Sequence, residues 1–166
     1  MATITIQGKT AHTCGELPAV GTTAPDFELV KGDLTTLKSD DLAGKRLVLN
    51  IFPSLDTGVC AVSVRKFNRL AENMDNTVVL AVSKDLPFAQ SRFCTVENIR
   101  NLIPLSAFRS DDFAERYGLK IVDGPMQGLL ARAVVVVGTD GKVVYTELVP
   151  EITDEPDYEA ARAALD

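Results

Sequence analysis

The stretch Arg46–Cys60, RLVLNIFPSLDTGVC, joins the two elements from which the fold can be argued. Residues 46–52 form a nearly continuous apolar run, which is typical of a strand buried on both faces of a sheet. Pro53 cannot donate a backbone hydrogen bond, and it ends that strand. Over residues 58–74 the apolar side chains recur at helical spacing. We therefore expect Cys60 in the first turn of a helix that follows a buried strand.

Outward from this stretch, strands and helices alternate along the chain. Apolar and β-branched runs predict further strands at 3–7, 27–30, 77–83, 102–106, 131–137 and 142–149. Apolar spacing and helix-start signals predict further helices at 87–94, 111–117 and 157–165. The order resembles a thioredoxin-like α/β fold, in which helices flank a central sheet, here with an N-terminal β-hairpin extension. We expect a single domain over residues 1–166.

Composition narrows the classes of partner. The net charge of −6 argues against binding to nucleic acid or to an anionic membrane surface, because both require positive charge. No apolar run approaches the ~20 residues of a membrane span. The N-terminus alternates like a strand and lacks the basic-then-apolar pattern of a signal peptide. A cytoplasmic protein is the resulting expectation.

The cysteines and the histidine limit the chemistry. Three cysteines are an odd number, which does not suit a static secreted disulfide framework. No His-x-x-His or Cys-x-x-Cys spacing supports a zinc site, so neither a metal nor a cofactor is expected. A papain-like cysteine–histidine pair would have to use the one histidine, His12, which lies in the N-terminal strand region.

The position of Cys60 favours a reactive thiolate. Unpaired N–H groups and the helix dipole favour negative charge in the first turn of a helix, and the thiolate is the nucleophilic form of cysteine. Lowering a thiol pKa from ~8.5 to ~6 gains about thirtyfold in thiolate at pH 7, but roughly tenfold is lost in nucleophilicity. Fast chemistry must therefore come mainly from stabilising charge that develops in the transition state.

Several motifs together resemble the peroxiredoxin family, specifically its bacterial, atypical two-cysteine thiol peroxidase branch. The active-site motif of that family matches Pro53-x-x-x-Thr57-x-x-Cys60. The branch is also matched by Phe88-Ala-Gln-Ser-Arg-Phe-Cys94, by Ala24-Pro-Asp-Phe27 and by Gly128-Leu-Leu-Ala-Arg132-Ala-Val. The likeness covers almost the whole chain.

The resemblance implies a role for each motif residue. Cys60 attacks hydrogen peroxide or an organic hydroperoxide, and Cys94 then resolves the sulfenic acid as an intrachain disulfide. Thr57 and Arg132 orient and polarise the peroxide, while Pro53 shields the sulfur from water. The resemblance further implies recycling by thioredoxin and a homodimer.

Each assignment has a structural alternative. Cys60 could be a buried small hydrophobe, Arg132 a salt-bridge residue at a strand end, and Cys94 a helix-packing residue. Cys14 matches no motif, and Arg65 and Lys66 are interpreted as a solvated helix face. Two rival functions are a thiol–disulfide oxidoreductase, which would want Cys-x-x-Cys where Thr57 stands, and a non-catalytic thioredoxin-like binding module.

Overall fold

A seven-stranded mixed sheet forms the centre of the computed structural model, which describes all 166 residues. Its strand order is β4-β3-β7-β6-β5-β8-β9. The strands are β3 (Glu28–Val30), β4 (Thr36–Lys38), β5 (Arg46–Ile51), β6 (Thr77–Ser83), β7 (Ile103–Ser106), β8 (Ala133–Val137) and β9 (Val143–Leu148). The pairs β5–β6 and β6–β7 are parallel, whereas β8 runs antiparallel to β5 and brings the C-terminal third of the chain beside the centre of the sheet.

Alternating side chains divide the core into two layers. In β5, Leu47, Leu49 and Ile51 join one buried cluster, and Val48 joins the cluster on the opposite face. The strands β6 and β8 alternate in the same way. Both faces of these central strands are thus buried, which explains why their sequences are apolar almost without interruption.

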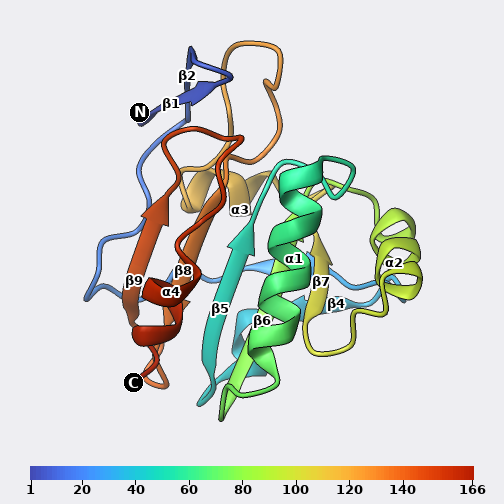
Figure 1. Cartoon of the computed structure of the whole chain (residues 1–166). Helices are drawn as coiled ribbons and strands as arrows, with labels where there is room; N and C mark the ends of the chain where they lie inside the picture. The colour runs from blue at the N-terminus through green and yellow to red at the C-terminus, as the bar shows by residue number, and fades with distance from the viewer.

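Helices cover both faces of the sheet (Figure 1). The helices α1 (Gly58–Ala71), α2 (Pro87–Val96) and α4 (Tyr158–Ala163) pack over β5–β8 on the face that carries Cys60. The short helix α3 (Asp111–Arg116) lies on the other face, where its Phe113 joins the larger cluster. A 3-10 turn, η1 (Ser39–Leu42), follows β4.

An N-terminal hairpin extends the molecule at one end of the sheet (Figure 1). It consists of β1 (Thr3–Ile6) and β2 (Lys9–His12), paired antiparallel with Ile6 opposite Lys9. The hairpin is tied to the segment after β9, because Thr5 N donates to the Pro150 carbonyl at 2.8 Å and Ile152 N donates to the Thr5 carbonyl at 2.9 Å.

The predicted central sheet, flanking helices and N-terminal hairpin are confirmed, with two corrections. The edge strand β4 was not predicted, since its three residues carry no long apolar pattern. The expected strand at 131–137 begins at Ala133, so Arg132 precedes the strand. Ala131 N instead donates to the Leu119 carbonyl at 2.9 Å, which places residues 130–131 in a separate short pairing.

Candidate active site around Cys60

Cys60 lies in the first turn of α1, where the sequence predicts it. Thr57 is the N-cap residue, and its Oγ1 accepts a hydrogen bond from Cys60 N at 3.4 Å. The Thr57 hydroxyl donates to the Ser54 carbonyl at 3.1 Å rather than to the Cys60 sulfur. The side chain of Cys60 is 0% exposed and packs in the apolar layer between the sheet and α1. The sulfur is therefore held at the positive end of a 14-residue helix, shielded from bulk water.

Arg132, which directly precedes β8 in the chain, also reaches the Cys60 sulfur. Its Nη2 donates to Cys60 Sγ at 3.3 Å, although the two residues are 72 positions apart. Its Nε donates to the Ile152 carbonyl at 2.9 Å, and the Arg132 carbonyl accepts from Val149 N at 3.0 Å. The side chain is 2% exposed. A buried guanidinium fixed at its backbone and at Nε is aimed at the sulfur.

One nitrogen of this guanidinium has no partner. Arg132 Nη1 is buried and makes no hydrogen bond within the protein. Leaving a buried charged donor unsatisfied costs free energy, so such groups are generally found where a ligand or a reacting atom completes the set. The free donor lies on the same planar group that touches Cys60. The group beside the sulfur therefore has a buried hydrogen-bond donor that the protein does not use.

A carboxylate and a phenol flank Arg132 on the α1–α4 side. Glu155 Oε1 accepts from Lys66 Nζ at 3.0 Å and from the Tyr158 hydroxyl at 2.8 Å. These two donors, with a smaller contribution from the Arg132 charge, lower the pKa of Glu155. Burial, followed by the nearby Glu155, raises the pKa of Tyr158. Lys66 was predicted as a solvated helix face. It is exposed, but it is ion-paired within this cluster, which no spacing in the sequence signals.

Asp85 anchors the loop between β5 and α1. Its carboxylate accepts from Ser54 Oγ at 2.7 Å, from Leu55 N at 2.8 Å and from Ser83 Oγ at 2.6 Å. Pro53 is buried at the start of this loop. Asp85 therefore fixes the loop that ends in the N-cap of α1. Its position directly after a buried strand was the available clue, and the sequence reasoning did not use it.

Cys94 is placed near the end of α2, apart from the Cys60–Arg132 contact. It is partly buried and packs against the apolar cluster that contains Cys60. A small cavity of about 150 Å³ lies between α2 and the β5–α1 loop, lined in part by Leu55, Ala89 and Phe93. Burial raises the pKa of the Cys94 thiol to about 11. All three cysteines are free, and Cys14 lies elsewhere, with its Sγ 3.6 Å from the Ala114 carbonyl oxygen.

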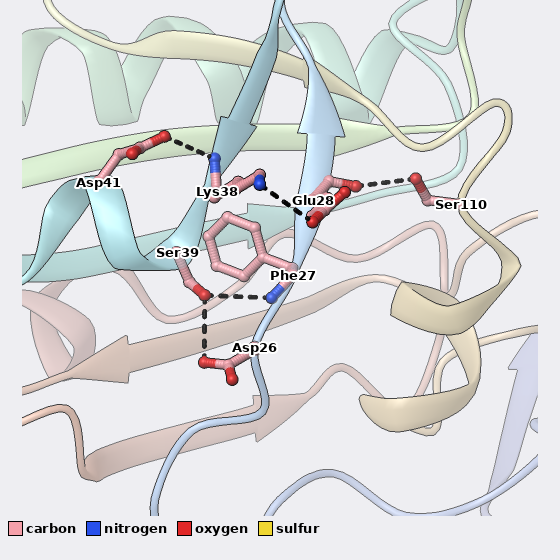
Figure 2. Close-up of polar contacts among 7 residues, drawn as sticks. All are labelled: Asp26, Phe27, Glu28, Lys38, Ser39, Asp41 and Ser110. Carbon is pink, nitrogen blue, oxygen red and sulfur yellow. Dashed lines mark hydrogen bonds and ion pairs between the residues drawn. The ribbon is translucent and has the colours of Figure 1, made fainter.

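A larger pocket, of about 660 Å³, opens at the β3–β4 edge of the sheet. Several of the polar groups around it pair with one another, as Figure 2 shows: Ser39 Oγ donates to Asp26, and Lys38 pairs with Glu28 at 3.6 Å. Ser110 Oγ also donates to the Glu28 carbonyl at 2.8 Å (Figure 2). The pocket contains no cysteine or histidine. These pairs link residues 26–28 to residues 38–39, and neither Cys60 nor Arg132 lines this pocket.

Two classes of feature are not present. No group of three or more His, Cys, Asp or Glu side chains is arranged to hold a metal ion. None of the helices combines the length and the apolar character that crossing a membrane requires.

Comparison with known proteins places this chain in a family. A family model described as Redoxin matches residues 19–161. The protein named thiol peroxidase from Mycobacterium tuberculosis (strain ATCC 25618 / H37Rv) is 61% identical over 165 residues, which cover 99% of each chain. The chain belongs to the Redoxin family. The thiol peroxidase of Corynebacterium glutamicum is 56% identical over the same share of both chains.

A solved structure supports the same Redoxin assignment at the level of the fold. The crystal structure of a peroxiredoxin-like protein from Aquifex aeolicus matches with a TM-score of 0.92 and 39% identity, covering 99% of this chain and 96% of that one. The thioredoxin-like fold and the peroxiredoxin resemblance predicted from the sequence are thereby confirmed.

Proposed function

We propose that this chain is a thiol peroxidase in which Cys60 is the peroxide-attacking residue. The observation that carries the assignment is the buried contact between Arg132 Nη2 and Cys60 Sγ, 3.3 Å long, with Nη1 of the same guanidinium unpartnered. A structural arginine would be expected to satisfy all its buried donors within the protein. A guanidinium with one donor on the nucleophile and one free can polarise a bound peroxide.

The first step is a displacement at oxygen. The Cys60 thiolate attacks the terminal, hydrogen-bearing oxygen of the peroxide ROOH, an S–O bond forms and the O–O bond breaks. The leaving RO⁻ takes up a proton as ROH, and Cys60 becomes a sulfenic acid. Arg132 Nη1 and Nη2 lie where they can stabilise the charge that moves onto the peroxide oxygens. The Thr57 hydroxyl can turn its proton from the Ser54 carbonyl to the substrate, and Pro53 keeps water away.

The second step joins Cys60 to Cys94. The Cys94 sulfur attacks the sulfenic acid, a disulfide forms within the chain and water leaves. Cys60 is fully buried and Cys94 is partly buried on a separate helix, so the two residues approach only after local unwinding. Local segments open without global unfolding. A dithiol reductant, for which we propose thioredoxin, then reduces the disulfide. We further propose a homodimer and a cytoplasmic location.

The test is peroxide consumption with an excess of dithiol, with insulin-type disulfide reduction as a parallel assay. We expect peroxide turnover in the wild type, its loss in Cys60→Ser, and near-complete retention in the matched control Cys14→Ser, whose thiol lies beside Ala114. Substantial turnover by Cys60→Ser would refute the assignment. Insulin reduction without peroxide turnover would identify a disulfide oxidoreductase, and inactivity in both assays would identify a binding module.

A further inference from the structure

The segment 150–153, between β9 and α4, connects Arg132 to the N-terminal hairpin. The carbonyl of Ile152 accepts the Arg132 Nε hydrogen bond at 2.9 Å. The N–H of the same residue donates to the Thr5 carbonyl in β1 at 2.9 Å. Both ends of the Ile152 backbone are thus engaged, one by the arginine and one by the hairpin. The position of the guanidinium depends on where the hairpin holds this segment.

Glu151 fastens the segment to the hairpin. Its Oε1 accepts from Gly8 N at 2.7 Å and from Thr5 Oγ1 at 3.0 Å. Its Oε2 accepts from Gln7 N at 3.2 Å, and from the N–H and hydroxyl of Thr153 at 2.9 Å and 2.8 Å. These bonds, led by those from the backbone N–H groups of Thr153 and Gly8, lower the pKa of Glu151 to about 2. The ionised carboxylate of Glu151 therefore binds both the β1–β2 hairpin and Thr153, two residues further along its own segment.

The guanidinium donates only one hydrogen bond to a protein oxygen, although the charge of Glu155 also acts on it. Nε is bonded to Ile152, Nη2 contacts the reacting sulfur and Nη1 has no protein partner. The Ile152 carbonyl is thus the acceptor that fixes the plane of the fork before peroxide arrives. A misplacement of ~1 Å at a reacting centre can cost about 10²-fold in rate. A small shift of Ile152 would accordingly reach the reaction through Arg132.

We propose that Glu151 is a positioning residue for peroxide reduction, which acts by holding Ile152, and through it Arg132, in register with Cys60. This inference rests on the proposed function of Cys60 and Arg132. Glu151 itself contacts neither the sulfur nor the arginine. The N-terminal hairpin is then part of the support of the active site.

Two variants test this role. Glu151→Gln keeps the size of the side chain but places an NH₂ group against donors, and Thr5→Val removes one hydroxyl donor at nearly constant volume. We expect the single-turnover rate of Cys60 oxidation by hydrogen peroxide to fall roughly tenfold in Glu151→Gln and less in Thr5→Val. Alkylation of Cys60 by iodoacetamide, which involves no peroxide oxygens, is expected to change much less. The matched control is Asp33→Asn. The Asp33 carboxylate accepts from Thr35 N and Oγ1 in the β3–β4 turn, away from the site. We expect this variant to leave the rates of peroxide oxidation and of alkylation unchanged.

A double-mutant cycle with Arg132→Lys separates positioning from general stability. If Glu151 acts through Arg132, adding Glu151→Gln to Arg132→Lys slows the reaction no further. Equal slowing in both backgrounds, or equal loss of peroxide and iodoacetamide rates, would overturn the inference. If Glu151→Gln does not fold, Thr5→Val is carried through the same cycle with the same criteria. An unchanged rate of Cys60 oxidation in Arg132→Lys would contradict the proposed role of Arg132. If Arg132→Lys reacts slowly but Glu151→Gln and Thr5→Val react at the wild-type rate, only the present inference is contradicted.

Discussion

Replacing Arg132 with methionine removes all its donors while keeping a side chain of similar length. The structure gives two consequences of different size. The Ile152 carbonyl loses its buried donor, which destabilises the fold by about 1–3 kcal/mol. The transition state loses Nη2, which contacts the sulfur, and Nη1, which we propose binds the peroxide; by analogy with a lost oxyanion donor this raises the barrier by about 2–4 kcal/mol. The rate of Cys60 oxidation is then expected to fall roughly 30- to 900-fold.

Stopped-flow mixing of reduced protein with hydrogen peroxide measures this rate, and thermal unfolding of the same samples shows that the variant is folded. The measurement is repeated at rising pH until the Cys60 thiol is fully ionised. We expect the defect to persist there, because thiolate formation alone changes the rate only a few-fold. Arg132→Lys, which keeps the charge but not the planar fork, is expected to fall between wild type and Arg132→Met. Recovery of the wild-type rate by Arg132→Met at high pH would show that the arginine only promotes ionisation.

Three further outcomes are expected. Peroxide-treated wild type should yield a Cys60–Cys94 crosslinked peptide by mass spectrometry and no covalent dimer on non-reducing gels; a dominant Cys14 linkage would contradict the resolving role of Cys94. Burial raises the pKa of the Cys94 thiol from 9.0 to about 11. Between pH 9 and 11 the thiol therefore ionises more readily when α2 has opened locally, and this favours the opened state. Over that range hydrogen exchange in α2 should accelerate more in wild type than in Cys94→Ala. The pKa of Glu151 is lowered from 4.5 to about 2, so Glu151 stabilises the fold above pH 4.5 and loses that effect as pH falls towards 2. The difference in melting temperature between wild type and Glu151→Gln should therefore shrink as pH falls from 4.5 to 2. A constant difference would contradict this account.

The sequence predicted strands best where both faces of the strand are buried. The strands β5 and β6 are covered on both faces, so their residues are mostly apolar, and 77–83 was predicted with the observed ends. β4 was missed because its three exposed or half-exposed residues gain strand geometry only from pairing with β3. The start of β8 was placed two residues early, since Ala131 is as apolar as the strand but pairs with Leu119 instead. Such competition between pairings cannot be read from a local pattern.

Within the candidate site, local patterns in the sequence likewise predicted contacts between residues that are close along the chain and missed contacts between distant ones. Thr57 and Cys60 belong to one helix start, so spacing alone places them together. The contact of Arg132 with Cys60 joins residues 72 positions apart and depends on the pairing of β8 with β5, which no local pattern predicts; only the family resemblance assigned Arg132 to the site. Glu151 was not predicted at all. It acts from an exposed turn, and its five donors come from the other end of the chain and from Thr153, so no motif marks it.

The distance along the chain between Cys60 and the arginine segment, residues 132–152, also bears on when the protein becomes reactive during synthesis. The nascent chain exposes Cys60 and can form α1 long before Arg132 and Ile152 have been made, since chains are synthesised from the N-terminus and fold as they emerge. Until then Cys60 lacks both its buried surroundings and its guanidinium partner. On the proposed function, a ribosome-bound chain that stops before residue 132 carries Cys60 without the guanidinium that polarises the peroxide. We therefore expect peroxide reactivity only after residues 132–152 have been made and have paired with β5 and β1.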